Sequence, residues 1–232
     1  MHMNIAVLGT GMVGRALANR LAELGHHVAI GTRNVDATLS HTAKGSMGLE
    51  PFKDWIEAQD NVRLATYKKA AVSSDLIVNA VAGMHSISAL ESIGARDLAG
   101  KVLLDLAIPL DLSNGIPPTL VISNDDSLGE QIQRAFPKTR VVKALHTVYY
   151  QVMIHPELVP GNHTIFMGGN DAEAKQVVRS VIASFGWPDE SIIDLGDITT
   201  ARATEMYSRL FFALYGKFGT FNFNINVTRA TK

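Results

Sequence analysis

The sequence predicts an α/β fold, with a doubly wound parallel sheet and a small α+β cap at its C-terminal end. Three observations support this prediction. Short apolar runs alternate with amphipathic helical segments, a glycine-rich turn follows the first apolar run, and the pattern changes after about residue 160. Strands that alternate with helices imply right-handed crossovers and a parallel sheet that is covered on both faces.

The predicted sheet begins at Asn4 to Leu8, a short apolar run that ends at a glycine. A helix follows over 12–24, where apolar residues share one face and Gly25 provides a typical C-terminal stop. Further strands are predicted at 28–30, 62–66, 75–81 and 101–106, with helices at 67–73 and from a Ser86 cap towards Arg96. The polar stretch 36–50 is predicted to be a loop with a single helical turn.

The remaining elements divide into the end of the sheet and the cap. A possible strand at 119–123, a helix at 127–136 and a strand at 140–145 complete the first domain, which we expect to span 1–155. The cap, 156–232, is predicted to contain strands at 164–167 and 191–195, helices at 171–185 and 200–217, and a terminal strand at 221–227. The terminal strand is predicted because apolar residues alternate there with asparagines.

Composition narrows the possible function classes. The chain has 232 residues, 47% hydrophobic and 19% charged, as in an ordinary globular protein. A net charge of -1 predicts no attraction to nucleic acid or to an anionic membrane surface. With 0 cysteines, disulfides, thiolate catalysis and cysteine-bound metals are excluded, and we expect no metal site. We expect a cytoplasmic protein, because no signal-peptide pattern precedes Asn4 and no apolar stretch reaches the roughly 20 residues of a membrane span.

A glycine-rich turn between the first strand and the first helix predicts a Rossmann-type dinucleotide site. Its residues match the pattern G-x-G-x-x-G, and they are Gly9, Thr10, Gly11, Met12, Val13 and Gly14. Gly9 permits the tight turn, Gly11 lets the pyrophosphate approach the backbone, and Gly14 lets the helix pack closely on the strand. The N-terminus of the helix then offers free N–H groups to the phosphates.

The end of the second strand predicts a preference for NADP over NAD. NAD enzymes place an acidic residue about 20 positions after the glycines, where it binds the ribose 2′-hydroxyl. Here that region reads Thr32-Arg33-Asn34, and no carboxylate occurs before Asp36. Arg33 would bind a 2′-phosphate as a charge-assisted partner, with Thr32 donating its hydroxyl. The alternative interpretation makes Arg33 a solvated surface residue or a partner that stacks on adenine.

Open sheets bind ligands beyond the carboxyl ends of their strands, which selects three further segments. Val81, Ala82, Ala107 and Pro109 are the small or apolar residues that we expect beside the nicotinamide. His85 and His146 are the ionisable residues in these segments, and His146 is the candidate catalytic residue. A histidine that simply binds backbone groups is the competing interpretation for both.

The chain resembles the NADPH-dependent coenzyme F420 reductases and related short dinucleotide-binding proteins. The motifs that carry the resemblance are MNIAVLGTGMVGRALANRLAELGHHVAIGTRN, DLIVNAVA, VLLDLAIPL and VVKALHT. The resemblance implies that Thr10, Thr32 and Arg33 contact the 2′-phosphate end of NADP, and that a deazaflavin stacks on the nicotinamide. The flavin-using reductase domains of some membrane metalloreductases are similar too.

The sequence departs from the family pattern near the second substrate. The family often has Asn-Pro where Ile108-Pro109 stands, and Asn-Thr where His146-Thr147 stands. The segment 36–61 is also longer than usual. These departures bear on the deazaflavin more than on NADP.

We therefore expect an oxidoreductase that transfers hydride between NADPH and a deazaflavin F420 or flavin acceptor. One alternative is an NADPH-dependent carbonyl or imine reductase, and another is a non-enzymatic protein that binds NADP and senses its redox state. We also expect a homodimer, because an apolar stripe recurs at helical spacing near the C-terminus. Its residues are Tyr207, Leu210, Phe211, Leu214, Tyr215 and Phe218.

Overall fold

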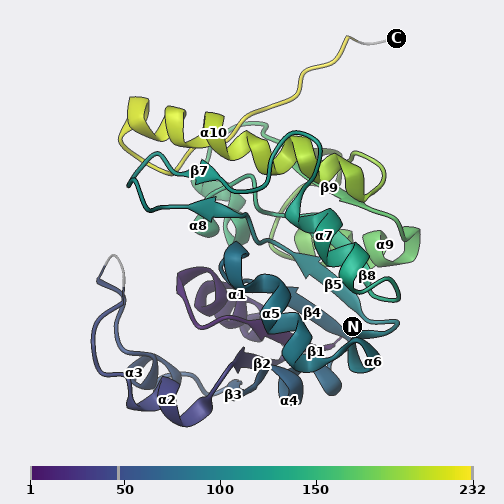
Figure 1. Ribbon diagram of the computed structural model, residues 1–232. Helices are drawn as coiled ribbons and strands as arrows, with labels where there is room; N and C mark the ends of the chain where they lie inside the picture. Colours follow the sequence, from purple (N-terminus) through teal and green to yellow (C-terminus); the bar gives the residue numbers. More distant parts are fainter. Residues whose placement is uncertain (1, 46–47, 231–232) are drawn as a thin grey trace.

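An eight-stranded sheet forms the centre of the molecule in the computed structural model, which describes residues 2–45 and 48–230 (Figure 1). The strand order is β3-β2-β1-β4-β5-β8-β9-β10. The bounds are β1 Asn4–Leu8, β2 His27–Thr32, β3 Val62–Thr66, β4 Leu76–Asn79, β5 Val102–Asp105, β8 Arg140–Ala144, β9 Ile165–Gly169 and β10 Ile192–Asp194. The strands from β3 to β8 in this order are parallel, which confirms the predicted Rossmann-type sheet.

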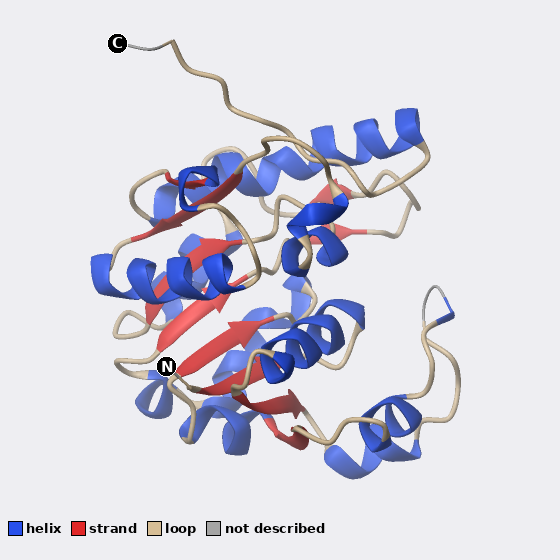
Figure 2. Ribbon diagram, turned by 180° about the vertical axis from the view of Figure 1, so that it is seen from behind, coloured by secondary structure: helices blue, strands red, loops and turns tan. Residues whose placement is uncertain are grey.

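Helices cover both faces of this sheet (Figure 2). One face packs against α1 Met12–Glu23, α3 Phe52–Glu57, α8 Tyr150–Ile154 and α9 Ala172–Ser184. The other packs against α4 Tyr67–Val72, α5 Gly83–Ile93, α6 Ala95–Leu98 and α7 Leu128–Ala135. Two further helices, α2 Val35–Ser40 and α10 Ala201–Phe218, lie at opposite ends of the molecule in Figure 1.

Alternation along the strands explains the two faces. In β1, Ile5 and Val7 belong to the core beneath α1, whereas Ala6 and Leu8 belong to the core beneath α4 and α5. Successive side chains of a strand point to opposite faces, so a strand that is buried on both sides must be apolar throughout. The continuous apolar run that predicted this strand is the direct consequence.

The strands of the C-terminal part extend the main sheet. β9 pairs antiparallel with β8, and β10 pairs parallel with β9. The sheet therefore continues past residue 155 without a break, and the boundary between 1–155 and 156–232 stays a prediction. α10 crosses one end of the molecule beside α7, so the C-terminal part is helical on its outer side (Figure 1).

The predicted terminal strand at 221–227 is wrong. This segment is irregular, and one backbone hydrogen bond joins Thr164 N–H to the carbonyl of Ile225 at 2.8 Å. Phe221 instead stacks on Tyr215 of α10, with ring centroids 3.9 Å apart. Aromatic packing on the helix and a hydrogen bond from the Asn224 side chain to the carbonyl of Thr164 hold the segment, which pairs with no strand among the described residues.

Two further expectations need correction. The helix predicted to start at a Ser86 cap begins at Gly83, where a Cβ would overlap the carbonyl of Ile108, so glycine allows this close start. Ser86 is buried inside the helix. In the stretch 36–50, expected to be a loop with a single helical turn, the helix is α2, which starts one residue earlier at Val35 and is capped by Asn34; α3 begins only at Phe52.

A short antiparallel pair, β6 Leu110–Asp111 and β7 Thr119–Leu120, follows β5 in the chain. This pair lies beside α10. The possible strand predicted at 119–123 corresponds to β7. No helix in the described ranges has both the length and the apolar character that crossing a bilayer requires.

Candidate functional site

The carboxyl ends of β1, β4, β5 and β8 meet at one edge of the sheet, because these strands are parallel neighbours. Open α/β sheets bind their ligands at this edge. The glycine turn follows β1 there, and the predicted segments at 81–82, 107–109 and 146–148 follow the other three strands. The fold therefore brings the residues predicted from the sequence to the same edge.

The three glycines of the turn have separate structural reasons. Gly9 adopts φ +111°, and a Cβ there would lie 2.6 Å from the carbonyl oxygen of Ala80. A Cβ on Gly14 would overlap the carbonyl of Gly9. A Cβ on Gly11 would meet nothing within 4 Å. Gly9 and Gly14 are thus required by the fold, whereas only a ligand in the open space would require glycine at position 11.

The turn also leads directly into a helix N-terminus. Gly11 is the N-cap of α1, and no side chain caps it. The first N–H groups of a helix lack partners within the helix, and the positive end of the helix dipole lies there. Met12 and Val13 occupy these first positions and are partly buried. The residues present fit the phosphates of a dinucleotide.

The end of β2 carries a cation and no acid. Arg33 is exposed, and the hydroxyl of the buried Thr32 lies 2.7 Å from the hydroxyl of Thr38. The side-chain oxygen of Asn34 accepts a hydrogen bond from Ala37 N–H at 2.9 Å and caps α2. Arg33 and Asn34 are both exposed, but Asn34 already has a structural role as the cap of α2, which leaves Arg33 as the cation available to a ligand.

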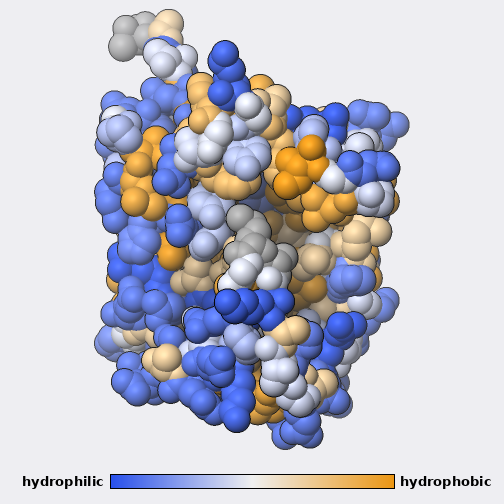
Figure 3. Space-filling view, turned by 90° about the vertical axis from the view of Figure 1, so that its left-hand side faces the viewer, coloured by the Kyte–Doolittle hydropathy of each residue, from blue (hydrophilic) through white to orange (hydrophobic). Residues whose placement is uncertain are grey.

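The neighbouring strand ends supply a mostly apolar lining. Val81, Ala107 and Pro109 are buried, whereas Ala82 and Met84 are exposed at the start of α5. Figure 3 shows a hollow on this side of the molecule, with apolar side chains gathered beside it. A flat apolar ring could pack against this lining, which is formed mostly by apolar side chains.

A row of buried polar side chains runs behind this lining. Asn79, Asp105 and Lys143 stand opposite one another in the register of β4, β5 and β8. Asn79 donates to Asp105 at 2.7 Å, and Lys143 Nζ lies 2.9 Å from Asp105 Oδ2. Lys143 also lies 2.9 Å from Glu205 of α10, which accepts hydrogen bonds from the first N–H groups of α7. The row fixes α7 and α10 relative to the strand ends.

His146 lies just beyond this row. It is 6% exposed, and within 2–45 and 48–230 neither ring nitrogen forms a hydrogen bond of normal geometry, although backbone groups of Ala144 and Thr204 lie near enough to oppose the fall in its pKa. Burial, together with the nearby charge of Lys143, holds the pKa of His146 well below its usual 6.5. The preceding residue, Leu145, adopts φ +68°, a left-handed conformation that costs a non-glycine residue free energy. The site therefore holds a neutral histidine with unused hydrogen-bonding groups.

Several residues of this site were missed in the sequence. Asn79, Asp105 and Lys143 each interrupt an apolar strand near its carboxyl end, in LIVN, VLLD and VVKA, and that pattern was the available signal. His85, the other histidine considered, is exposed on the first turn of α5. The described parts of the chain contain no cluster of side chains suited to a metal ion.

Comparison with known proteins agrees with this site. Residues 4–109 match the family model described as NADP oxidoreductase coenzyme F420-dependent. A candidate F420-dependent NADP reductase from Arthrobacter sp. FB24, solved as a crystal structure, is 48% identical with a TM-score of 0.92. The match covers 98% of this chain and 100% of that one.

Two curated relatives are more distant. The F420-dependent NADP reductase of Methanocaldococcus jannaschii is 29% identical over 97% of this chain and 98% of its own length. The metalloreductase STEAP3 of Rattus norvegicus is 27% identical over 87% of this chain, which corresponds to 35% of that longer protein. The glycine turn, the strand order and the near-full-length matches to the Arthrobacter and Methanocaldococcus proteins agree, and the chain belongs to the family of coenzyme F420-dependent NADP oxidoreductases.

Proposed function

We propose that this protein is an NADP(H)-dependent oxidoreductase that transfers hydride between NADPH and a deazaflavin of the F420 type. The observation that carries the proposal is the glycine turn, in which Gly11 faces open space at the N-terminus of α1. The residues that would hold the dinucleotide phosphates are Gly9, Thr10, Gly11, Met12, Val13 and Gly14. Family membership supplies the second substrate.

The 2′-phosphate would be held at the end of β2. Arg33 is exposed there and has no competing carboxylate before Asp36, so its guanidinium is available to an anion. Thr32 and Thr10 would add hydroxyl groups. A carboxylate at this place would repel the 2′-phosphate, so its absence favours NADP over NAD.

The hydride would pass between the two rings beside the strand ends. When bound, the nicotinamide and the deazaflavin supply the hydride chemistry themselves, and the protein positions them and excludes water. Val81, Ala82, Ala107 and Pro109 would line the nicotinamide side. His146 would donate a hydrogen bond to a ring carbonyl, since its imidazole is neutral and its nitrogens form no hydrogen bond of normal geometry in the described ranges.

The neutral state of His146 separates this proposal from a carbonyl or imine reductase. Those reactions need a proton donor near the reduced carbon, and a histidine whose pKa lies well below 6.5 is a poor donor at neutral pH. Hydride transfer to a deazaflavin makes smaller demands on a protein acid. The charged side chains near these strand ends, Asp105, Lys143 and Glu205, pair with one another, which favours the two-ring reaction.

The decisive experiment is anaerobic turnover with purified protein. NADPH oxidation should be followed with F420, with FAD and with a cyclic imine as separate acceptors. Rapid reduction of F420 supports the proposal, and preference for the imine supports the reductase alternative. Tight NADPH binding without turnover of any acceptor would favour a redox sensor.

We also propose that the protein works in the cytoplasm as a homodimer, without a nucleic-acid or membrane partner. Its 0 cysteines suit a reducing compartment, and its net charge of -1 offers no attraction to polyanions. The dimer is proposed because Leu210 and Phe218 of α10 remain exposed.

A further inference from the structure

Arg15, the residue after the third glycine of the turn, is buried without an ion pair. It is only 7% exposed. Its Nε donates to the carbonyl of Thr10 at 2.9 Å, and its Nη1 donates to the carbonyl of Glu50 at 2.8 Å. Across the described ranges no carboxylate forms a salt bridge with it. Both partners are thus neutral backbone carbonyls, one from the glycine turn and one from the residue before Pro51.

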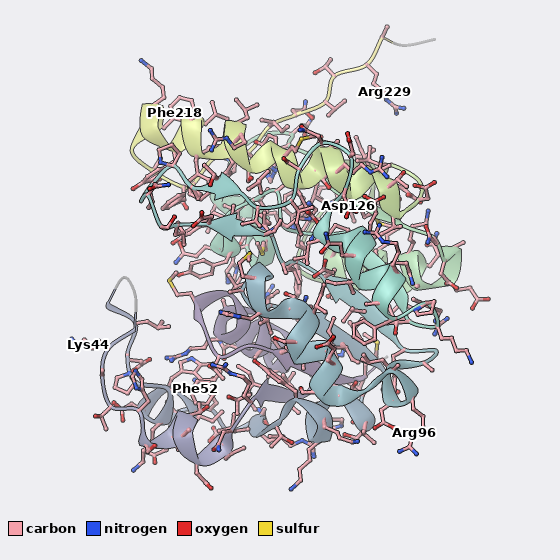
Figure 4. All side chains as sticks on the ribbon, in the orientation of Figure 1. Lys44, Phe52, Arg96, Asp126, Phe218 and Arg229 are labelled. Atoms are coloured by element: carbon pink, nitrogen blue, oxygen red, sulfur yellow. The ribbon has the colours of Figure 1, made fainter. Side chains whose placement is uncertain are left out.

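Two aromatic rings complete the environment of Arg15. Its Cζ lies 5.1 Å from the ring centroid of Phe52 and 5.6 Å from that of Trp55. Both rings belong to α3, and Figure 4 labels Phe52 there. Cations are attracted to aromatic faces at these distances, more strongly when water is excluded. The segment 50–55 therefore covers Arg15 and fixes its orientation.

A buried positive charge with no ion pair is costly unless an anion compensates it. Burial lowers the pKa of Arg15 and the charge of Glu50 opposes this effect, yet an arginine stays protonated. The guanidinium is bonded to the glycine turn itself, at the start of α1. An anion that binds to this turn would meet both the helix N-terminus and the charge of Arg15.

The hydrogen bond to Thr10 has a second consequence. A carbonyl oxygen in the turn carries partial negative charge and would repel a phosphate that it faced. Arg15 holds the Thr10 carbonyl through Nε, which leaves the N–H groups of the turn to the ligand. Because Arg15 also contacts the two rings of α3, its side chain alone links α3 to the turn.

We propose that Arg15 is a positioning residue for the dinucleotide pyrophosphate, and that α3 acts as a strap that keeps it in place. This inference rests on the proposed function, because it assumes that a dinucleotide binds at the turn. It assigns a role to segment 36–61. It also distinguishes two sources of affinity: Arg33 serves the 2′-phosphate, and Arg15 serves the pyrophosphate that NADPH and NADH share.

The test measures the dissociation constants of NADPH and NADH for the full chain, together with Tm without nucleotide. Arg15→Gln should raise both constants by about tenfold, the scale of one charge-assisted hydrogen bond, while kcat at saturation stays within about twofold. Arg20→Gln, an arginine of the same helix that pairs with Glu23, is the matched control and should leave both constants unchanged.

A second pair of variants tests the strap. Trp55→Leu should raise both constants by about threefold through the lost cation–π contact. Lys53→Ala, on the same helix with an exposed side chain, should have no effect. If Arg15→Gln does not fold, the dissociation constants of Arg15→Lys and Trp55→Leu for the two nucleotides test the inference instead.

Three outcomes would overturn the inference. A folded Arg15→Gln protein with unchanged constants would mean that Arg15 is only structural, as would a fall in Tm alone. A loss of affinity for NADPH, with NADH affinity unchanged, would assign Arg15 to the 2′-phosphate. Wild-type protein that binds neither nucleotide would refute the proposed function itself and this inference with it, and the wild-type titration shows that result separately.

Discussion

The ammonium group of Lys143 lies 2.9 Å from the carboxylate of Asp105, and both side chains are almost completely buried. The two residues stand opposite each other in β8 and β5. Glu205 lies at 2.9 Å from the same nitrogen, so one cation serves two buried carboxylates. Such a group stabilises the fold only while all its members are present.

Lys143→Met should therefore lower the free energy of unfolding by about 3–5 kcal/mol, because it leaves two buried carboxylates without their cation. Urea denaturation at pH 7 measures this loss. Lys53→Met, on the exposed surface of α3, is the control and should change stability by less than about 0.5 kcal/mol. If Lys143→Met and Lys53→Met lower the free energy of unfolding by equal, small amounts, the prediction is wrong.

The same cation predicts a pH dependence. Burial lowers the pKa of Lys143, but the charges of Asp105 and Glu205 outweigh burial and raise it above 10.5. A raised pKa contributes stability that is fully present below pH 10.5 and is lost as pH rises through the folded-state value. The wild type should lose more stability in this alkaline range than Lys143→Met does, and parallel losses would contradict the assignment.

Local signals made much of this fold predictable. The glycine spacing and the uniformly apolar β1 are features of a few consecutive residues, so the turn and the central strands followed from sequence. A local pattern marks Asn79, Asp105 and Lys143 one by one, as polar residues that interrupt apolar strands, but their contact with one another depends on the register between strands far apart in the chain. At 221–227 the alternation was present, but stacking of Phe221 on Tyr215 decided the structure.

Arg33→Ala should weaken NADPH binding by about 2 kcal/mol, the scale of a charge-assisted hydrogen bond, and leave NADH binding almost unchanged. The reason is that Arg33 is the cation at the end of β2, where only NADPH carries a phosphate. Arg96→Ala removes another exposed arginine, which pairs with Asp97, and serves as the control. Equal losses for both nucleotides in a titration would refute the assignment.

Gly11 and Gly14 should respond differently to the addition of a side chain. Gly11→Val should fold normally, since a Cβ there meets nothing within 4 Å, yet it should lose dinucleotide binding because the side chain occupies ligand space. Gly14→Ala should lose stability, because its Cβ would overlap the carbonyl of Gly9. Thermal unfolding and NADPH titration separate the two effects. Near-normal NADPH affinity in Gly11→Val would place the phosphates elsewhere.

The homodimer prediction concerns the outer face of α10. Leu210 is 51% exposed and Phe218 is 56% exposed, whereas Phe211 and Tyr215 pack against Phe221. Sedimentation at micromolar concentration should give a dimeric mass for the wild type. The double change Leu210→Glu and Phe218→Glu should give a monomer, because charges at both positions oppose burial of this face. A monomeric wild type would refute the dimer.

His146 should behave as a ligand-orienting group. His146→Ala should weaken acceptor binding and lower turnover modestly, well below the roughly 10²–10⁴-fold loss that follows removal of a general acid. His146→Gln, which keeps a hydrogen-bond donor, should recover part of the lost binding. Steady-state kinetics with F420 as the varied substrate separate KM from kcat.

The pH dependence of the same residue provides an independent check. Burial and the charge of Lys143 hold the pKa of His146 well below 6.5, so its imidazole should stay neutral in the folded protein from pH 6.5 upwards. A depressed histidine pKa costs stability as pH falls below 6.5, where the unfolded chain binds the proton and the folded chain does not. His146→Gln should remove that acidic loss, and its pH–rate profile should match the wild type.

A large fall in kcat with acceptor binding intact, together with the loss of one limb of the profile, would make His146 the proton donor. That outcome would favour a carbonyl or imine reductase, in which the protein protonates the substrate heteroatom as hydride arrives, whereas the proton that a reduced deazaflavin takes up on its ring nitrogen can come from solvent.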